Sequence, residues 1–140
     1  MKIREMTIKD YKQVYQLWLD TPNMGLYDYD DSEGSIAKFL DRNPGLCFVA
    51  EIEGEIIGVV LSGHDGRRGR IYHLAVSQSA QGNGIGAALV DAVAVALERE
   101  GIAMVALVAY TKNEQGNAFW EKHGFKLYED LVFRSRELNV

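Results

Sequence analysis

The segment Gln81 to Gly86 contains the residues best suited to bind a phosphate. It lies between an apolar, strand-like run, Ile71 to Val76, and an amphipathic helix pattern that begins near Gly84. Glycine has no Cβ, so the backbone of such a segment can turn sharply and approach a ligand closely. The first N–H groups of a helix have no intrahelical partner and lie at the positive end of the helix dipole. The segment therefore predicts an anion site.

Two nucleotide-binding motifs fit the segment poorly. The dinucleotide fingerprint Gly-x-Gly-x-x-Gly is met only in its relaxed form, starting at Gly82, and the acidic residue expected about 20 positions further on is replaced by Ile102 to Ala106. The triphosphate loop ends in Gly-Lys-Ser/Thr, whereas Ala87 follows Gly86 here. A nucleotide-binding regulatory domain is therefore a weak alternative.

Two motifs resemble the GNAT superfamily of N-acetyltransferases. Gln81 to Gly86 is similar to its Arg/Gln-x-x-Gly-x-Gly/Ala signature, which binds the pyrophosphate of acetyl-coenzyme A (acetyl-CoA). Asn113 and the run Ala118 to Phe125 resemble its closing motif, an Asn before a short helix that ends in Glu-Lys-x-Gly-Phe. The resemblance implies an acetyl-CoA-dependent N-acetyltransferase. It would move an acetyl group directly to a primary amine of a small molecule, protein or peptide.

The resemblance also implies where acetyl-CoA binds. The strands Arg70 to Val76 and Met104 to Ala109 would diverge, and the pantetheine arm would lie between them. Backbone groups of Leu74 and Val76 would pair with the pantetheine amides, and the Leu74 N–H would polarise the thioester carbonyl. The residues implied to bind acetyl-CoA are Leu74, Ala75, Val76, Gln81, Gly82, Asn83, Gly84, Ile85, Gly86, Ala87, Asn113 and Trp120.

The sequence does not identify a general base, which the transfer needs because a protonated ammonium has no lone pair. Many GNAT members have Glu or His two and four residues before the position of Leu74, where this chain has Tyr72 and Arg70. Tyrosine and arginine have reference pKa values of about 10 and above about 12, so Tyr72 is either an active-site wall or a direct catalytic group. Strand alternation predicts that His73 points to the opposite face and packs under a helix. Deprotonation would then use ordered water or a carboxylate elsewhere.

The proton donor for the leaving thiolate also differs from that of many members. Trp120 stands where they have Tyr, and an indole N–H donates a hydrogen bond but is not a useful proton source. Trp120 is expected either to pack against the pantetheine or to lie in the core. Asn113 is expected to cap the last helix, to contact coenzyme A, or both.

Two loops are candidates for binding the acceptor. The loop Met24 to Asp31 combines two tyrosines with three aspartates, Tyr27, Tyr29, Asp28, Asp30 and Asp31. These side chains either attract a cationic amine or form a solvated loop that caps the following helix. The turn Asp65 to Arg70 contains three arginines, which either bind a carboxylate or keep the hairpin tip soluble.

Composition indicates an ordinary globular protein. The 140 residues, 47% of them hydrophobic and 25% charged, predict one domain over residues 1–140. The net charge of −5 argues against nucleic-acid binding. No apolar run approaches the roughly 20 residues of a membrane span, so we expect a cytoplasmic protein with no membrane partner. Cys47 is the only cysteine and lies in an apolar run, so we expect no metal, no disulfide and no covalent relay.

The order of predicted elements indicates an α+β fold. We expect a strand at 2–6, helices from Asp10 and over Ser32 to Arg42, and three antiparallel strands, Leu46 to Ile52, Glu55 to Ser62 and Arg70 to Val76. A long helix then leads to a buried strand, Met104 to Ala109, parallel to the strand before it. A short helix and two strands, Lys126 to Tyr128 and Leu131 to Arg136, follow. By resemblance, the sheet is mixed and mostly antiparallel, and its central parallel pair is split to admit acyl-CoA.

Two questions stay open at this point. A non-catalytic acyl-CoA-binding sensor or regulatory module is the main alternative to an enzyme, because the usual Glu and Tyr are missing. The exposed edge of the predicted tail strands would permit a homodimer.

Overall fold

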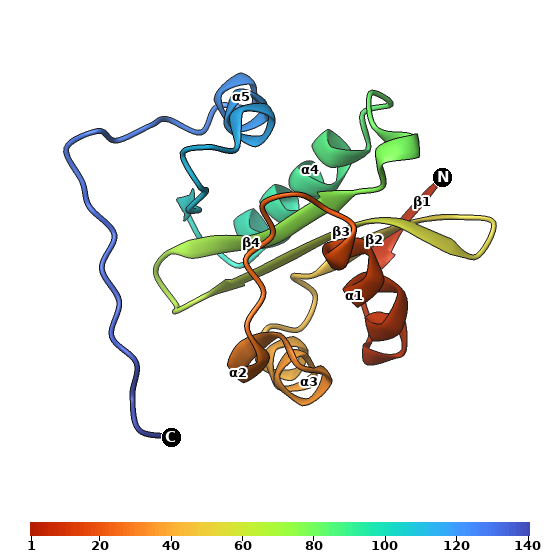
Figure 1. The fold of residues 1–140 in the computed structure, drawn as a ribbon, viewed down its shortest axis with the longest axis horizontal. Coiled ribbons are helices and arrows are strands. Elements are labelled where there is room, and N and C mark those ends of the chain that lie inside the picture. The colour runs from red at the N-terminus through yellow and green to blue at the C-terminus, as the bar shows by residue number, and fades with distance from the viewer. The chain divides into compact units, whose positions relative to one another are not determined.

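The computed structural model describes all 140 residues, and the chain divides into two compact units, Met1–Val108 and Ala109–Val140. Unit 1 contains a five-stranded sheet in the order β1-β2-β3-β4-β5 (Figure 1). Its strands are β1 (Lys2–Glu5), β2 (Phe48–Ile52), β3 (Glu55–His64), β4 (Gly69–Val76) and β5 (Val105–Ala106). The first four are antiparallel neighbours and β5 pairs with β4 in parallel, which confirms the predicted mixed, mostly antiparallel sheet.

Local turn chemistry explains the antiparallel order. Glu53 and Gly54 both have positive φ, 50° and 81°, as the two central residues of a tight hairpin turn require. In the next turn, Asp65 Oδ1 accepts hydrogen bonds from the N–H groups of Arg67 at 2.8 Å and Arg68 at 3.0 Å. Glu53 and Gly54 thus separate the strands predicted at Leu46 to Ile52 and Glu55 to Ser62, and Asp65 begins the predicted turn Asp65 to Arg70.

The helices cover both faces of the sheet (Figure 1). Unit 1 has α1 (Tyr11–Leu19), α2 (Asp28–Asp31), α3 (Glu33–Arg42) and α4 (Ile85–Arg99), with single 3₁₀ turns at Ile8–Asp10 and Gln78–Ala80. On one face, Val14 and Trp18 of α1 join Val59 in a core cluster, and all three are fully buried. On the other face, Gly58 lies under α4, where a Cβ would be only 3.0 Å from Leu89 Cδ1.

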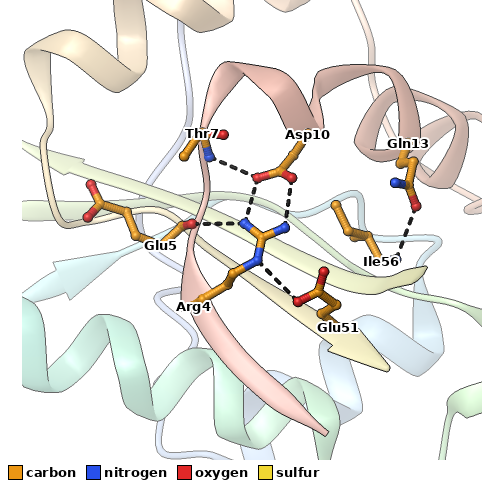
Figure 2. Close-up of polar contacts among 7 residues, drawn as sticks. All are labelled: Arg4, Glu5, Thr7, Asp10, Gln13, Glu51 and Ile56. Atoms are coloured by element: carbon orange, nitrogen blue, oxygen red, sulfur yellow. Dashed lines mark hydrogen bonds and ion pairs between the residues drawn. The ribbon is translucent and has the colours of Figure 1, made fainter. Parts of the chain in front are cut away.

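An arginine network fixes the start of α1 against the sheet (Figure 2). Arg4 Nη1 and Nη2 donate to the two carboxylate oxygens of Asp10 at 2.9 and 2.8 Å, and Arg4 Nε donates to Glu51 at 3.3 Å. The Thr7 N–H also donates to Asp10. Burial opposes ionisation of Asp10, but the bonds from Arg4 and Thr7 outweigh it and hold the pKa of this carboxyl below its usual value. The network therefore holds α1, which carries Trp18, in place over β3 and β4.

The sequence prediction is wrong for the last strands. Residues 126–136 form no strand, and in the structure Leu127, Leu131, Val132 and Phe133 are each at least 67% exposed. Alternating apolar residues predict a strand only if a neighbouring strand supplies hydrogen bonds, and an isolated pair of strands is marginal in water. The suggested homodimer depended on the edge of these strands, so these residues no longer support it.

The strand expected at Met104 to Ala109 is also shorter than predicted and is not buried. Only Val105–Ala106 is a strand, and Met104 and Val108 are more than half exposed. β5 is the last strand of the order, so the parallel pair lies at the edge of the sheet and not at its centre. No further strand of unit 1 pairs with the outer edge of this apolar run. Unit 2 contains one helix, α5 (Glu114–Lys122).

Candidate active site

A β-bulge in β4 shapes the segment predicted to contact the thioester. Leu61 pairs with Tyr72 and Val59 with Ala75, so His73 and Leu74 both stand opposite Val60. The extra residue makes a bulge, which bends the strand and redirects side chains. His73 has φ 49°, a left-handed conformation that residues other than glycine seldom adopt. Such a strained position is typical of functional sites.

The bulge overturns the prediction that Tyr72 and His73 point to opposite faces. The Tyr72 ring lies 5.7 Å from Phe39 of α3, and the His73 ring lies 5.0 Å from Trp18 of α1. Both helices lie on the face of the sheet opposite α4, so Tyr72 and His73 point to the same face. Side chains do not alternate between the two faces here because the bulge adds one residue to the strand. Tyr72 is 40% exposed, and the guanidinium of Arg70 lies 5.8 Å from its ring centre.

His73 also binds a buried carboxylate. Its Nε2 lies 2.7 Å from Asp31 Oδ1, while Asp31 Oδ2 accepts the N–H of Tyr27 at 2.9 Å. Asp31 is only 5% exposed. Burial opposes ionisation of Asp31, but hydrogen bonds from His73 and Tyr27 outweigh it and keep the pKa of the carboxyl below its usual value.

Sequence reasoning missed this pair. Asp31 and His73 are 42 positions apart, and neither has a motif that points to the other. Asp31 was expected among the exposed aspartates of the acceptor loop, whereas it is the buried one of the three. Of that loop, Tyr27 and Tyr29 are more than half exposed and their rings stack at 5.4 Å.

The glycine segment has the backbone expected of an anion site. Gly82 and Gly84 have φ of 83° and 76°, and no atom lies within 4 Å of the Cβ that a larger residue would add. The N–H groups of residues 82–87 donate to no other group of the protein. They lie at the N-terminus of α4, a 15-residue helix. Such free donors fit a pyrophosphate.

Side chains of the same segment hold its shape. Gln81 Nε2 donates to the carbonyl of Val76 at 3.1 Å, and Asn83 Nδ2 donates to the carbonyl of Ala80 at 3.1 Å. The first bond ties the segment to the end of β4. The side-chain amides of Gln81 and Asn83 therefore both donate to main-chain carbonyls near the segment, and one of these carbonyls is that of Val76.

The edge of β4 beside β5 is open where the family would bind pantetheine. β5 pairs only with Gly69 and Arg70, and β4 continues to Val76 without it. The strands are therefore joined at one end only, as a split pair should be. Unpaired N–H and C=O groups on a strand edge fit an extended ligand that carries amides.

Asn113 and Trp120 lie in unit 2, Asn113 just before α5 and Trp120 within it. Asn113 Oδ1 accepts the N–H of Gly116 at 3.0 Å, which makes Asn113 the N-cap of the helix. The Trp120 ring lies 5.0 Å from Phe119 and 5.0 Å from Phe125. The cap expected of Asn113 is therefore present, and Trp120 packs in a local aromatic cluster that the sequence does not predict.

Cys47 lies in the buried core, within the apolar run seen in the sequence. It is 1% exposed, and its Sγ lies 3.4 Å from the carbonyl of Ser62. Burial raises the pKa of the thiol to about 11. A thiol of this kind is a poor nucleophile, because the thiolate is the reactive form.

Among the helices, none is long and apolar enough to cross a membrane.

Comparison with known proteins agrees with this geometry. The model of the Acetyltransferase (GNAT) family matches residues 11–125. An acetyltransferase of Pectobacterium atrosepticum is 31% identical over 136 residues, which cover 97% of this chain and 95% of that protein.

Two crystal structures share the fold. The PaiA N-acetyltransferase of Thermoplasma acidophilum, in complex with coenzyme A, has a TM-score of 0.79 at 19% identity and covers 91% of this chain and 90% of that one. An aminoglycoside acetyltransferase from an uncultured soil metagenomic sample, in complex with sisomicin, has a TM-score of 0.76 at 23% identity, with 99% and 96% covered. The family match spans most of the chain, and this protein belongs to the GNAT family of acetyltransferases.

Proposed function

We propose that this protein transfers the acetyl group of acetyl-CoA directly to a primary amine. The observation that carries the proposal is the run of unpaired N–H groups at residues 82–87, which follows the open edge of β4 after one short turn. Acetyl-CoA presents a pyrophosphate and an amide-bearing arm, and these two features of the chain complement those two groups. We propose that both units form one acetyltransferase domain, since the family match at 11–125 runs through both.

In this proposal, the residues of the chain bind acetyl-CoA and polarise its thioester carbonyl. The N–H groups of residues 82–87 bind the pyrophosphate, and backbone groups of Leu74, Ala75 and Val76 hold the pantetheine arm. The Leu74 N–H donates to the thioester oxygen, where negative charge develops as the amine attacks. Donors fixed in place before the reaction stabilise such charge by about 3 kcal/mol each in other acyl transfers. Bound acetyl-CoA supplies the activated acetyl group.

The setting of Cys47 supports direct transfer to the amine, without a covalent enzyme intermediate. Its thiol is buried with a pKa raised to about 11, and it is the only cysteine of the chain. Asn113 caps α5 in this account and is available to contact coenzyme A through its remaining amide atoms.

The acceptor we propose is cationic. Asp28 and Asp30 lie on α2 beside the stacked rings of Tyr27 and Tyr29, and all four side chains are exposed. Carboxylates attract an ammonium group, and aromatic faces bind cations. The acceptor is therefore a small polyamine-like molecule or a basic peptide. Acceptors are tested with a panel of amines. The panel includes an aminoglycoside, because one structural relative is named for that class.

One observation favours the alternative of a non-catalytic acyl-CoA sensor. Trp120 stands where many members have an acid for the leaving thiolate, and it packs between Phe119 and Phe125. A sensor would bind acetyl-CoA without releasing free coenzyme A thiol. Replacing Trp120 with Tyr should speed up the reaction if the missing acid limits it, and an unchanged rate excludes that limitation.

Binding is tested by thermal unfolding with acetyl-CoA. At a hundredfold excess over its Kd, a ligand stabilises the folded state by about 2.7 kcal/mol, which raises the Tm of a protein of this size by roughly 5 to 10 °C. Acetyl-CoA should produce this shift and a dinucleotide should not. No shift with acetyl-CoA would contradict the proposal.

A matched pair of glycine variants locates the site. Gly84 and Gly66 both have positive φ, 76° and 92°, with open space where a Cβ would go, but Gly66 lies in the β3–β4 turn. Gly84→Ala and Gly66→Ala should therefore lose similar stability. Only Gly84→Ala should also weaken acetyl-CoA binding, by about tenfold or more. Equal weakening in both variants would move the site away from the glycine segment.

A further inference from the structure

We propose that His73 is the general base of the acetyl transfer and that Asp31 positions it. The inference rests on the function proposed above and assigns the group that the sequence left unassigned. It starts from the 2.7 Å contact between His73 Nε2 and Asp31 Oδ1, at the bulge that also contains Leu74.

The contact with Asp31 sets the state of the imidazole ring. Asp31 is an acceptor, so His73 Nε2 carries the proton and donates it to Asp31 Oδ1. The lone pair of the neutral ring is then on Nδ1. This atom has no hydrogen-bond partner in the protein and is not fully enclosed, and the His73 side chain is 19% exposed. The ring therefore presents a free basic nitrogen toward solvent.

Asp31 is itself held so that it can orient the ring. Its second oxygen, Oδ2, accepts the N–H of Tyr27, and the Tyr11 hydroxyl donates to its main-chain carbonyl at 2.7 Å. The start of α2 thus holds the carboxylate, α1 holds the main chain of Asp31, and Trp18 packs edge-on against the His73 ring. A buried carboxylate beside a histidine fixes its tautomer and stabilises the imidazolium that forms when the ring takes a proton.

The bulge brings the base next to the proposed polarising group. His73 and Leu74 are consecutive, with Cα atoms about 3.8 Å apart, and both stand opposite Val60. Their side by side placement is paid for by backbone strain at His73, with φ 49°. This strain is accounted for if the ring has to lie beside the Leu74 N–H.

The proposed step conserves protons and electron pairs. Nδ1 of neutral His73 takes a proton from the acceptor ammonium, and the freed nitrogen lone pair forms the C–N bond to the acetyl carbon. The C–S bond breaks, and its electron pair goes to sulfur, which takes up one proton. The new amide nitrogen loses its second proton, so one proton is released to solvent for each acetyl group transferred.

The pH dependence follows from the charged groups around the ring. These are Asp31 and Asp30 of α2, Tyr11 of α1 and, on the same strand, Arg70 over Tyr72. Glu33 of α3 lies near Tyr11. Asp31 contacts the ring, and Asp30 interacts with it electrostatically. Because only an unprotonated ring nitrogen can take a proton from the amine, we expect kcat/KM for the amine to fall on the acid side of its pH profile.

The test replaces the base without disturbing the bulge. His73→Asn suits the site because asparagine tolerates positive φ better than most residues. Removing a general base costs about 10²- to 10⁴-fold in rate, so kcat/KM for the amine should fall by that factor, and the acid limb of its pH profile should disappear. Asp31→Asn should lower kcat by a smaller factor and leave the KM for acetyl-CoA unchanged.

A second His–carboxylate pair provides the control. His64 Nε2 contacts Glu100 Oε1 at 2.8 Å, at the far end of β3, so Glu100→Gln breaks a bond of the same kind away from Leu74. This variant should keep the wild-type kcat/KM and pH profile. The acetyl-CoA thermal shift of His73→Asn should equal that of the wild type, which shows that the variant is folded.

The outcomes separate this inference from the proposed function. An active wild type with a His73→Asn variant of equal kcat/KM and unchanged pH profile overturns the role of His73 alone. A wild type that acetylates no amine of the panel overturns both. A His73→Asn variant that unfolds is replaced by His73→Gln, judged by the same two readouts.

Discussion

Two aspartates in this protein stay ionised although they are buried, because each binds a cationic or N–H donor. Asp10 is 7% exposed and Asp31 is 5% exposed. Hydrogen bonds from Arg4 and Thr7 lower the pKa of Asp10, and those from His73 and Tyr27 lower the pKa of Asp31. A carboxyl whose pKa is lower in the folded state stabilises the fold above its unfolded pKa. That contribution is lost as the pH falls through the folded value.

The first prediction concerns the Asp10 network and acid. Asp10→Asn should lower the free energy of unfolding at pH 7 by about 2 kcal/mol, because it replaces charged hydrogen bonds with neutral ones. The difference from wild type should shrink as the pH falls through and below 3.8, the usual pKa of an aspartate. Urea unfolding at several pH values measures it.

The matched control is Asp41, which is exposed and lies in the last turn of α3 without an ion pair. Asp41→Asn should change stability by less than about 0.5 kcal/mol at every pH. An Asp10→Asn variant that behaves like Asp41→Asn would show that the network does not stabilise the fold.

The second prediction concerns Cys47. Burial raises its pKa to about 11, so a thiol reagent should label it in the native protein at pH 8 far more slowly than in the unfolded chain. Cys47→Ala should keep the rate of acetyl transfer, because the proposed route has no covalent enzyme intermediate. A variant that loses transfer while keeping its Tm would favour a route through an acetylated thiol.

At the scale of elements, glycines decide how closely helices approach the sheet. Gly58 of β3 lies under α4, where a Cβ would be 3.0 Å from Leu89 Cδ1 and 3.1 Å from Ile85 Cγ2. Ile85 is the first residue of α4 and lies within the glycine segment Gln81 to Gly86. The packing of this helix therefore sets the position of the N–H groups at residues 82–87.

The third prediction compares two glycine-to-alanine substitutions with opposite expected effects on stability. Gly58→Ala should destabilise the protein by about 1 to 2 kcal/mol, because overpacking pushes α4 outward, and it should also weaken acetyl-CoA binding. Gly34→Ala lies in α3 with open space around its Cβ, so it should stabilise by up to about 1 kcal/mol through helix propensity. Thermal unfolding with and without acetyl-CoA measures both. A Gly58→Ala protein as stable as the wild type would refute the close packing.

Element-scale patterns also explain what the sequence could predict. The 3.6-residue apolar period of α4 and the turn at Glu53 and Gly54 are local, so both are visible in the sequence. The prediction of strands at Lys126 to Tyr128 and Leu131 to Arg136 is wrong for a physical reason. A strand requires a partner, and the alternation at Leu131 to Arg136 says nothing about whether one is present.

At the scale of the whole molecule, the predicted family and the glycine segment rest on contiguous motifs, and the family is confirmed. The His73–Asp31 pair forms because α2 packs near β4, although the two residues are 42 positions apart. It also depends on the bulge, in which one extra residue in β4 redirects the His73 side chain. No periodicity in a single sequence encodes either. Because site residues brought together by tertiary packing have no local signature, strand alternation placed His73 on the wrong face.

The central claim is that this chain turns over acetyl-CoA and does not merely bind it. The most direct measurement is the release of free coenzyme A thiol with an amine panel that includes a polyamine, a basic peptide and an aminoglycoside, with the acetylated amine measured alongside. We expect equal amounts of free thiol and acetylated amine, formed at the same rate by the wild type and by Cys47→Ala. A protein that acetyl-CoA stabilises against heat, but that releases no thiol with any of these amines, would contradict it and indicate a sensor.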